Sequence, residues 1–355
     1  MTYLLGILKD GSGGNFQEWV RACESSKHDI EYRVIDLFAS DWLEIVHSED
    51  YDCYLARPPA SVDIHKRIYD ERLFVVNKVL KKSIYPSYGE LLIYENKQML
   101  AYWLEAHSIP HPRTWIFYDR NEALRFTAQC TLPVVAKTSI GASGSGVRII
   151  RDRNEFRKYV ETVFSEDGIR RKWGPNLRRG DFWKRLVSRI KNPVRFYRYF
   201  RSKYEAVAMS PQRGFVILQE YVQCDSEWRC VRIGDSYFAH KKLRGRGEMF
   251  SGTSMVGWER PPEGLLNFTK EVCDAGDFLS QAVDIFEQKD GKYMVNELQC
   301  FFGSKNPHQM IVDGKPGRYV QVSGRWVFEG GSFNGNNSFD LRLTHVIELL
   351  NRGLL

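Results

Sequence analysis

The cysteines of this 355-residue sequence include no Cys-x-x-Cys pair, and their number, seven, is odd. A disulfide framework uses an even set of cysteines, and a structural zinc site needs cysteines or histidines at short, regular spacing. The eight histidines show no such spacing either. These absences argue against a disulfide-stapled secreted domain and against a zinc domain, and they predict a reducing, cytoplasmic compartment.

Long hydrophobic runs are also missing. The apolar run from Tyr3 to Leu8 is too short for the core of a signal peptide, and no later run approaches the length that spans a membrane. The complete Gly-x-Gly-x-x-Gly fingerprint and the Walker P-loop are absent as well. With 43% hydrophobic and 14% aromatic residues, the sequence predicts a globular protein of two or three domains.

Basic residues are concentrated in one window, about residues 168–204. This window has thirteen Lys or Arg, one acid and eight aromatics, so it carries +12, whereas the whole chain carries +7 and the remainder −5. The pattern around residues 182–191 predicts amphipathic helices. A basic face opposite aromatic side chains suits an anionic membrane surface, an acidic polysaccharide or RNA, although no recognised RNA-binding module accompanies it. A solvated, decorative helix is the alternative.

The first ninety or so residues predict a small open α/β sheet. Apolar runs predict strands near residues 3–8, 32–35 and 53–56, and the apolar spacing of residues 16–23 predicts a helix. The glycine-rich loop at residues 10–14 stands between the first strand and that helix, where a ligand could bind; a plain turn is equally compatible with it.

Two later strands place side-chain oxygens on one face. Residues 281–287 and 293–298 predict a hairpin around an Asp-Gly turn. Alternation along the second strand points Glu297 and Gln299 the same way, and an antiparallel partner can bring Asp284 opposite them. Magnesium prefers oxygen ligands of this kind. An ordinary hairpin with solvated acids is the alternative.

Two lysines occupy positions suited to anions. Asn96 predicts the cap of a helix that ends before Pro110, and Lys97 falls in its first turn, where the helix dipole disfavours a cation unless an anion is close. Lys137 ends a strand and precedes a loop of Gly, Ala, Ser and Thr, whose backbone N–H groups can surround phosphate oxygens. A solvated lysine and an empty hairpin tip are the alternatives.

A third segment runs from an apolar strand into a polar linker. Glu220, Tyr221 and Val222 close the strand, and Glu227 follows seven residues after the first glutamate. Such a linker can offer backbone groups to an adenine edge, and the later carboxylate can accept from ribose hydroxyls. A simple strand-turn-strand is the alternative.

In this order the four segments resemble the ATP-grasp superfamily, which includes D-alanine–D-alanine ligase, glutathione synthetase and ribosomal S6 modification enzymes. The resemblance covers about residues 90–310, and the N-terminal unit is similar to the domain that precedes the grasp. It implies an ATP-grasp fold of α+β lobes: an N-terminal α/β domain at 1–92, a small lobe with the basic insertion at 93–222 and a large lobe at 223–355.

The resemblance also implies roles. ATP would be bound by Lys97, Lys137, Ser139, Gly141, Ser143, Gly144, Glu220, Tyr221, Val222 and Glu227. Magnesium would be held by Asp284, Glu297 and Gln299, although the family usually has asparagine at the last of these positions. Lys242 and Arg244 are the expected catalytic cations near the γ-phosphate, unless they lie on a solvated basic strand.

Two departures from the family bear on the substrate. Some members have an arginine two residues before the metal aspartate that binds a substrate carboxylate, whereas this chain has Ala282, which argues against small amino-acid substrates of that kind. The 83 residues from Lys137 to Glu220 exceed the usual spacing and include the basic window. After the metal strand, Lys305, Asn306 and His308 are expected substrate contacts, and a packing loop is the alternative.

The sequence therefore predicts an ATP-dependent carboxylate–amine ligase that proceeds through an acyl phosphate. Resemblance to proteins that modify bacterial surface polysaccharides favours an acidic sugar polymer or its precursor, with peripheral contact at the inner membrane face through residues 168–204. Two alternatives are a phosphotransferase acting on a hydroxyl and a nucleotide-binding membrane adaptor. The oligomeric state is left open.

Overall fold

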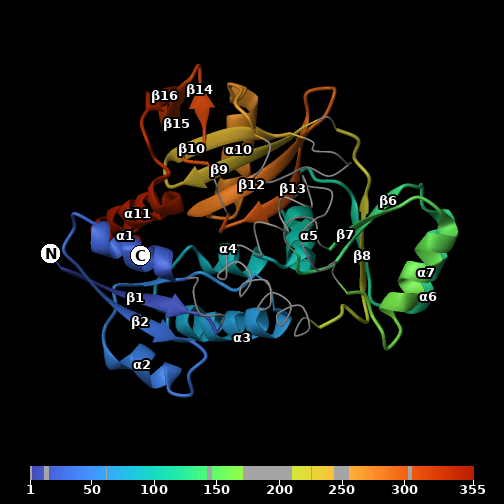
Figure 1. Cartoon of the computed structure of the whole chain (residues 1–355), viewed down its shortest axis with the longest axis horizontal. Coiled ribbons are helices and arrows are strands. Elements are labelled where there is room, and N and C mark those ends of the chain that lie inside the picture. The colour runs from blue at the N-terminus through green and yellow to red at the C-terminus, as the bar shows by residue number, and fades with distance from the viewer. Residues whose placement is uncertain are drawn as a thin grey trace, which may run out of the picture.

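The computed structural model describes residues 2–11, 16–60, 62–141, 146–170, 210–224, 226–243, 256–302 and 306–355, which form three β-sheets with flanking helices (Figure 1). The predicted helices at 182–191 and most of the basic window lie outside the described residues. All seven cysteines are buried and free. Within the described residues, no helix is both long and apolar enough to cross a membrane.

The N-terminal sheet is parallel, with strand order β2-β1-β3-β4. Its core includes Leu5, Ile7 and Leu8, which are fully buried. This confirms the predicted α/β start. The elements are β1 (Tyr3–Lys9), α1 (Gln17–Ser25), β2 (Ile30–Asp36), α2 (Trp42–Ser48), β3 (Cys53–Leu55), α3 (Asp63–Phe74), the π-helix η1 (Val75–Val79) and β4 (Ile84–Tyr85).

Two short helices lead from this sheet to the next. In α4 (Tyr88–Ile93), Ser87 and Glu90 form a capping box, in which each side chain accepts from the other's backbone N–H. In α5 (Lys97–Ala106), the side chain of Asn96 accepts from the N–H of Met99 at 3.1 Å. The predicted cap of this helix is therefore confirmed.

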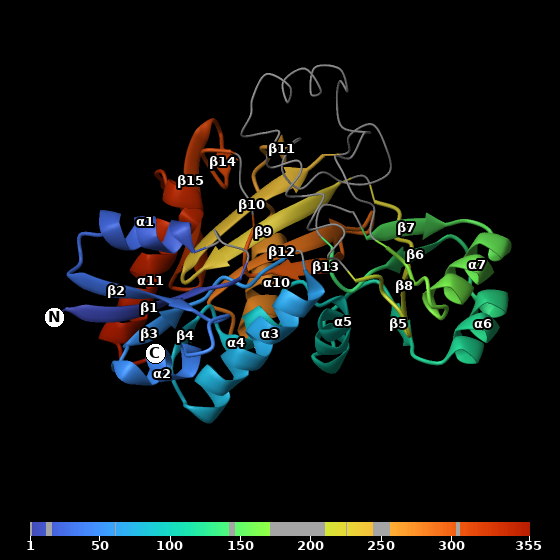
Figure 2. The same ribbon diagram turned by 60° about the horizontal axis from the view of Figure 1, so that its bottom comes forward.

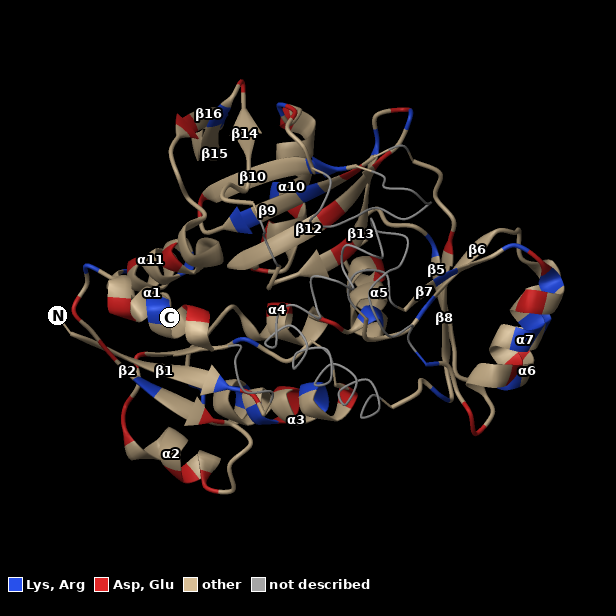
Figure 3. Ribbon diagram, viewed as in Figure 1, with Lys and Arg blue, Asp and Glu red and all other residues tan. Residues whose placement is uncertain are grey.

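The second sheet is antiparallel, with order β5-β8-β6-β7. Helices α6 and α7 lie together on its outer side (Figures 1 and 2), and Asp119 and Asp152 cap them. Figure 3 shows both charge signs on each of these helices. The elements are β5 (Thr114–Phe117), α6 (Arg120–Gln129), β6 (Val134–Lys137), β7 (Val147–Ile150), α7 (Arg153–Val163) and β8 (Val216–Glu220).

The third sheet is the largest, with order β13-β12-β9-β10-β15-β14 and with β11 and β16 paired to β10 and β15. Helix α10 packs on one face through Leu265, Val272 and Cys273. The elements are β9 (Glu227–Ile233), β10 (Ser236–Lys242), β11 (Val256–Gly257), α10 (Glu263–Ala275), β12 (Ser280–Glu287), β13 (Tyr293–Gln299), β14 (Ile311–Val312), β15 (Lys315–Val322) and β16 (Arg325–Gly330).

The last segment returns to the first sheet. After the short 3-10 helix η2 (Gly335–Ser338), helix α11 (Phe339–Asn351) lies beside α1 (Figure 1) and places Phe339, Val346 and Ile347 in the N-terminal core. Two ends of the chain thus contribute to one hydrophobic core. The domain boundaries expected at 92/93 and 222/223 stay predictions.

Candidate functional site

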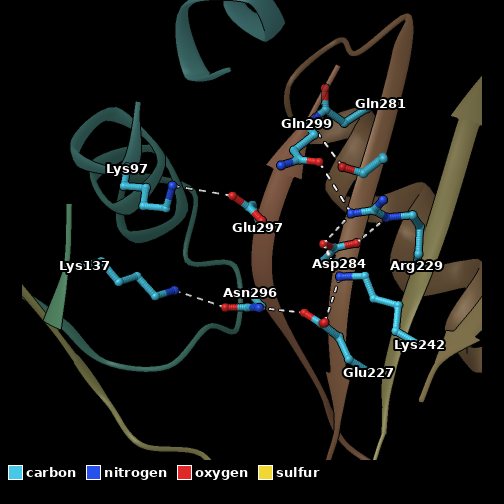
Figure 4. A network of polar contacts seen from close by, with 11 residues as sticks. Lys97, Lys137, Glu227, Arg229, Lys242, Gln281, Asp284, Asn296, Glu297 and Gln299 are labelled. Atoms are coloured by element: carbon cyan, nitrogen blue, oxygen red, sulfur yellow. Dashed lines mark hydrogen bonds and ion pairs between the residues drawn. The ribbon is translucent and has the colours of Figure 1, made fainter. Parts of the chain in front are cut away.

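The predicted acidic face is formed by β12 and β13. Asp284 lies opposite Glu297 in the β12–β13 ladder, and Ala282 lies opposite Gln299. On the other side of β12, Asp284 is paired with Arg229 of β9. The three side-chain oxygen donors predicted from the sequence therefore project from the same region of the large sheet (Figure 4).

A β-bulge adds a fourth polar side chain to this region. The ladder shifts register after Asp284, so that Ile285 pairs with Val295 and Asn296 is the extra residue. The Asn296 amide donates to Glu227 Oε1 at 2.6 Å and accepts from Lys137 Nζ at 3.1 Å. Strict alternation would have turned Asn296 to the opposite face. The bulge instead lets Asn296 bridge Lys137 of the second sheet and Glu227 of the third.

Asp284 is 2% exposed and is held by two cations. Arg229 donates from Nε to Oδ1 at 2.8 Å and from Nη2 to Oδ2 at 2.9 Å, a bidentate pair, and Lys242 Nζ also donates to Oδ2. Burial alone would raise the pKa of Asp284, but the charges of Arg229 and Lys242 outweigh it and hold the pKa well below its usual value. Asp284 is therefore a carboxylate at neutral pH.

Glu227, the residue expected at the ribose, is buried, and its ribose role stays a prediction. It is 3% exposed, and its Oε2 accepts from Lys242 Nζ at 2.8 Å while its Oε1 accepts from Asn296. Burial raises its pKa, with the Lys242 charge acting in the opposite sense. Lys242, a predicted catalytic cation, is buried between Glu227 and Asp284 rather than on a solvated strand. Arg244 lies outside the described residues.

Lys97 and Lys137 point toward β13 from the side opposite Arg229 and Lys242 (Figure 4). Lys97 Nζ lies 3.6 Å from Glu297 Oε1 and donates to the carbonyl of Gly141 at 3.1 Å, and its N–H donates to the carbonyl of Ser139. The sequence predicted an anionic partner for this lysine, and Glu297 is that partner. Both lysines expected at the phosphates therefore contact β13.

Burial lowers the pKa of Lys137 to about 8, and the nearby Lys97 charge acts in the same direction. If this ammonium binds phosphate, the affinity for the ATP analogue AMP-PNP should fall about tenfold between pH 7 and pH 9, as the lysine loses its proton. The free energy of unfolding should change in the opposite sense, rising as pH increases through 8, because the unfolded lysine keeps its proton to higher pH.

Calorimetric titrations of wild type and Lys137→Arg across this range measure the effect. The arginine stays charged, so its pH profile should be flat. Parallel profiles for the two proteins would mean that Lys137 does not contact the nucleotide.

The remaining predicted residues are more dispersed. Glu220 is exposed at the end of β8, where its N–H donates to the carbonyl of Arg113 at 2.8 Å, and the half-buried Tyr221 and Val222 follow outside any strand. The backbone carbonyl of Asn306 accepts from the side-chain amide of Asn334 at 2.8 Å, and His308 is half-buried. Ser143, Gly144 and Lys305 lie outside the described residues. The nucleotide and substrate roles of all these residues stay predictions.

The donor set suits magnesium. Two carboxylates and an amide oxygen are the ligands that this ion takes alongside phosphate and water. Arg229 Nη2 reaches Asp284 and also lies 3.4 Å from Gln299 Oε1, so these oxygens are close together. Glu297 is 26% exposed and can be reached from solvent. Among the described residues there is no cluster of three or more His, Cys, Asp or Glu, so this mixed set is the candidate.

Arg229 and Asn296 take part in the polar contacts around Asp284 and Glu227, but the sequence did not predict either of them. Arg229 stands two residues after Glu227, so strand alternation alone places the two on one face. That signal was available, but it does not identify the partner strand. Asn296 is brought in by the bulge, which no sequence pattern in this hairpin marks.

Comparison with known proteins gives one family match. Residues 99–170 match the family described as the carbamoyl-phosphate synthase L chain, ATP binding domain. A sequence relative, the alpha-aminoadipate–LysW ligase LysX of Saccharolobus solfataricus, is 22% identical over 278 residues, which are 76% of this chain and 83% of the relative.

Solved structures match over most of the chain. D-alanine–D-alanine ligase from Bacillus anthracis has a TM-score of 0.54 at 14% identity, covering 99% of this chain and 98% of the other. N5-carboxyaminoimidazole synthase from Aspergillus clavatus has 0.55 at 10%, covering 99% of both. A RimK domain ATP-grasp protein from Sphaerobacter thermophilus has 0.50 at 15%, covering 83% of this chain and 89% of the other.

Proposed function

We propose, from the premise that this chain has the ATP-grasp fold, that it is an ATP-dependent carboxylate–amine ligase. The observation that supports this most strongly is the convergence of two lysines with Asp284, Glu297 and Gln299 (Figure 4). The lysines would neutralise phosphate charge, and the oxygens would hold magnesium, which when bound would polarise the β- and γ-phosphates. Such catalysis depends on positioning and charge, and needs no nucleophilic side chain.

In the proposed reaction, a substrate carboxylate oxygen attacks the γ-phosphorus of ATP, and ADP leaves. The amine then attacks the acyl carbon, and inorganic phosphate departs as the amide forms. Lys137 and Lys97 would face the phosphates, while Lys242 stays with Glu227 and Asp284 and fixes the sheet side of the site. Lys97 and Lys137 would thus act electrostatically on the phosphates, whereas the role of Lys242 would be structural.

We infer that at least one substrate is an amino acid or an amino-acid side chain. The sequence relative is named for ligation of alpha-aminoadipate, and the aligned part spans 83% of it. The acidic sugar polymer expected from the resemblance and the basic window has weaker support, because the sequence relative is named for an amino acid instead. It stays a prediction, as do peripheral membrane contact and the binding of acidic polymers.

A coupled assay tests the proposed ligase. Purified protein is incubated with ATP, Mg²⁺ and a panel of carboxylate and amine pairs, and phosphate release and product mass are followed together. A ligase should release one phosphate for each amide formed. The product mass should equal the sum of the two substrate masses minus one water. A phosphorylated product would support the phosphotransferase instead, and ATP binding without either product would support the adaptor.

The basic window can be tested separately. If residues 168–204 bind an anionic surface, deleting 170–203 should remove binding to phosphatidylglycerol vesicles and to a polyuronate, and added salt should weaken the wild-type binding. Binding that is unchanged by the deletion would contradict this role.

A further inference from the structure

The N-terminal sheet has a feature that the proposed ATP site does not use. Its strands are all parallel and lie in the order β2-β1-β3-β4, so the chain adds β2 on one side of β1 and then β3 on the other. In open parallel sheets, ligands bind beyond the carboxyl ends of the strands at the point where the order switches sides. Arg57 lies two residues after the end of β3, which places it at this edge of the sheet.

Arg57 is held in a defined orientation. Its Nη1 donates to Glu18 Oε2 at 2.5 Å, and its backbone N–H donates to the hydroxyl of Tyr69 at 3.1 Å. The guanidinium carbon lies 5.3 Å from the centre of the Phe339 ring and 6.0 Å from that of Phe301. The side chain is 26% exposed, so this oriented cation can still be reached from solvent.

The aromatic support of Arg57 continues directly into the candidate metal strand. Phe301 stands two residues after Gln299, and it stacks on Phe339 with ring centres 5.9 Å apart. The fully buried Arg342 lies over both rings and donates to the carbonyl of Cys300 at 3.3 Å and to the hydroxyl of Ser280 at 2.9 Å. The end of β13 is therefore fixed against the edge where Arg57 lies.

Tyr94 connects the two regions. Its ring meets Phe301 edge-on, with centres 6.1 Å apart. Phe301 is also the ring that lies 6.0 Å from the guanidinium carbon of Arg57. Tyr94 thus packs against the residue that both follows the candidate metal strand and supports Arg57.

We propose that Arg57 binds a second carboxylate of the substrate, the one that is not activated by ATP. This inference rests on the proposed ligase function and specifies its substrate class as a dicarboxylic amino acid. A guanidinium suits this role because its donors match the two oxygens of a carboxylate. Position 282, where some ATP-grasp enzymes have a carboxylate-binding arginine, is an alanine in this chain.

Calorimetry with L-glutamate as the probe tests the proposal in the presence of saturating AMP-PNP and Mg²⁺. Wild type should bind L-glutamate, and Arg57→Gln should bind it at least about tenfold more weakly, the usual loss for one charged hydrogen-bonded contact. L-glutamine, which lacks the second carboxylate, should bind both proteins weakly and equally. Arg57→Lys keeps the positive charge but lacks the paired donors of the guanidinium, so its affinity for L-glutamate should lie between those of wild type and Arg57→Gln.

Arg33→Gln is the matched control, because it removes another arginine of the same sheet that is paired with a glutamate. It should bind L-glutamate like wild type. If L-glutamate fails to bind wild type, or binds Arg57→Gln equally well, while AMP-PNP binds both proteins, the Arg57 proposal is wrong and the ligase proposal stands. Failure of wild type to bind AMP-PNP would instead overturn the proposed function itself. Arg57→Lys provides the same comparison if Arg57→Gln does not fold.

Discussion

Glu297→Gln should lower Mg²⁺-dependent ATP turnover by about 10² to 10³-fold, the range typical for loss of one charge-stabilising group in an active site. Glutamine keeps the size of the side chain and one carbonyl oxygen, so the sheet should remain intact. It removes the negative charge that faces Lys97 at 3.6 Å and that would help to bind a divalent cation. The affinity for Mn²⁺, measured by paramagnetic resonance with AMP-PNP present, should fall about 10 to 100-fold.

Asp290→Asn is the control for this variant. Asp290 lies in the turn of the same hairpin and pairs with Lys292 at 2.8 Å, where both side chains are exposed. Its replacement should leave turnover and Mn²⁺ affinity unchanged. Normal Mn²⁺ affinity in Glu297→Gln would mean that Glu297 is not a metal ligand.

Arg229→Ala should destabilise the protein by about 3–5 kcal/mol, because it leaves a buried carboxylate without its bidentate partner. Asp284 is 2% exposed, and Lys242 then has to serve both Asp284 and Glu227. At neutral pH the wild-type pair contributes its full stability. That contribution is lost as pH falls through the lowered pKa of Asp284, so the variant should lose less stability in acid than wild type.

Urea unfolding of Arg229→Ala and of Arg232→Ala measures the difference. Arg232 is on the same strand, is 19% exposed and pairs with Asp274 at 2.6 Å, but Asp274 is 42% exposed and its charge stays in contact with solvent when Arg232 is removed. Partly exposed pairs contribute about 0–1 kcal/mol, so this control should lose much less stability than Arg229→Ala. Equal losses for the two variants would show that burial of the Asp284 pair does not carry the effect.

Local patterns predicted the parts of the site that depend on one or two elements. The Asp-Gly turn and strand alternation predicted the hairpin and the shared face of Glu297 and Gln299. The position of Lys97 in the first turn of α5 predicted an anionic partner, because a cation there opposes the helix dipole. Each of these inferences needs only the chain within a few residues, where backbone geometry is strongly constrained.

The features of the site that the sequence did not predict depend on which distant segments pair in the fold. The contact of Arg229 with Asp284 spans 55 residues and follows from which strands become neighbours. The bulge at Asn296 depends on a register shift that apolar alternation does not encode. Helix α11 belongs to the segment expected as the large lobe at 223–355, yet it enters the N-terminal core, where Phe339 and Phe301 meet beside Arg57.

In the proposed function, the β12–β13 edge of the large sheet holds the metal of an ATP site (Figure 4). A crystal structure with AMP-PNP and Mn²⁺, with anomalous data collected to locate manganese, tests it directly. We expect an anomalous peak within coordination distance of the side-chain oxygens of Asp284, Glu297 and Gln299 and of the phosphates. Nucleotide bound with manganese away from all three side chains would contradict the assignment.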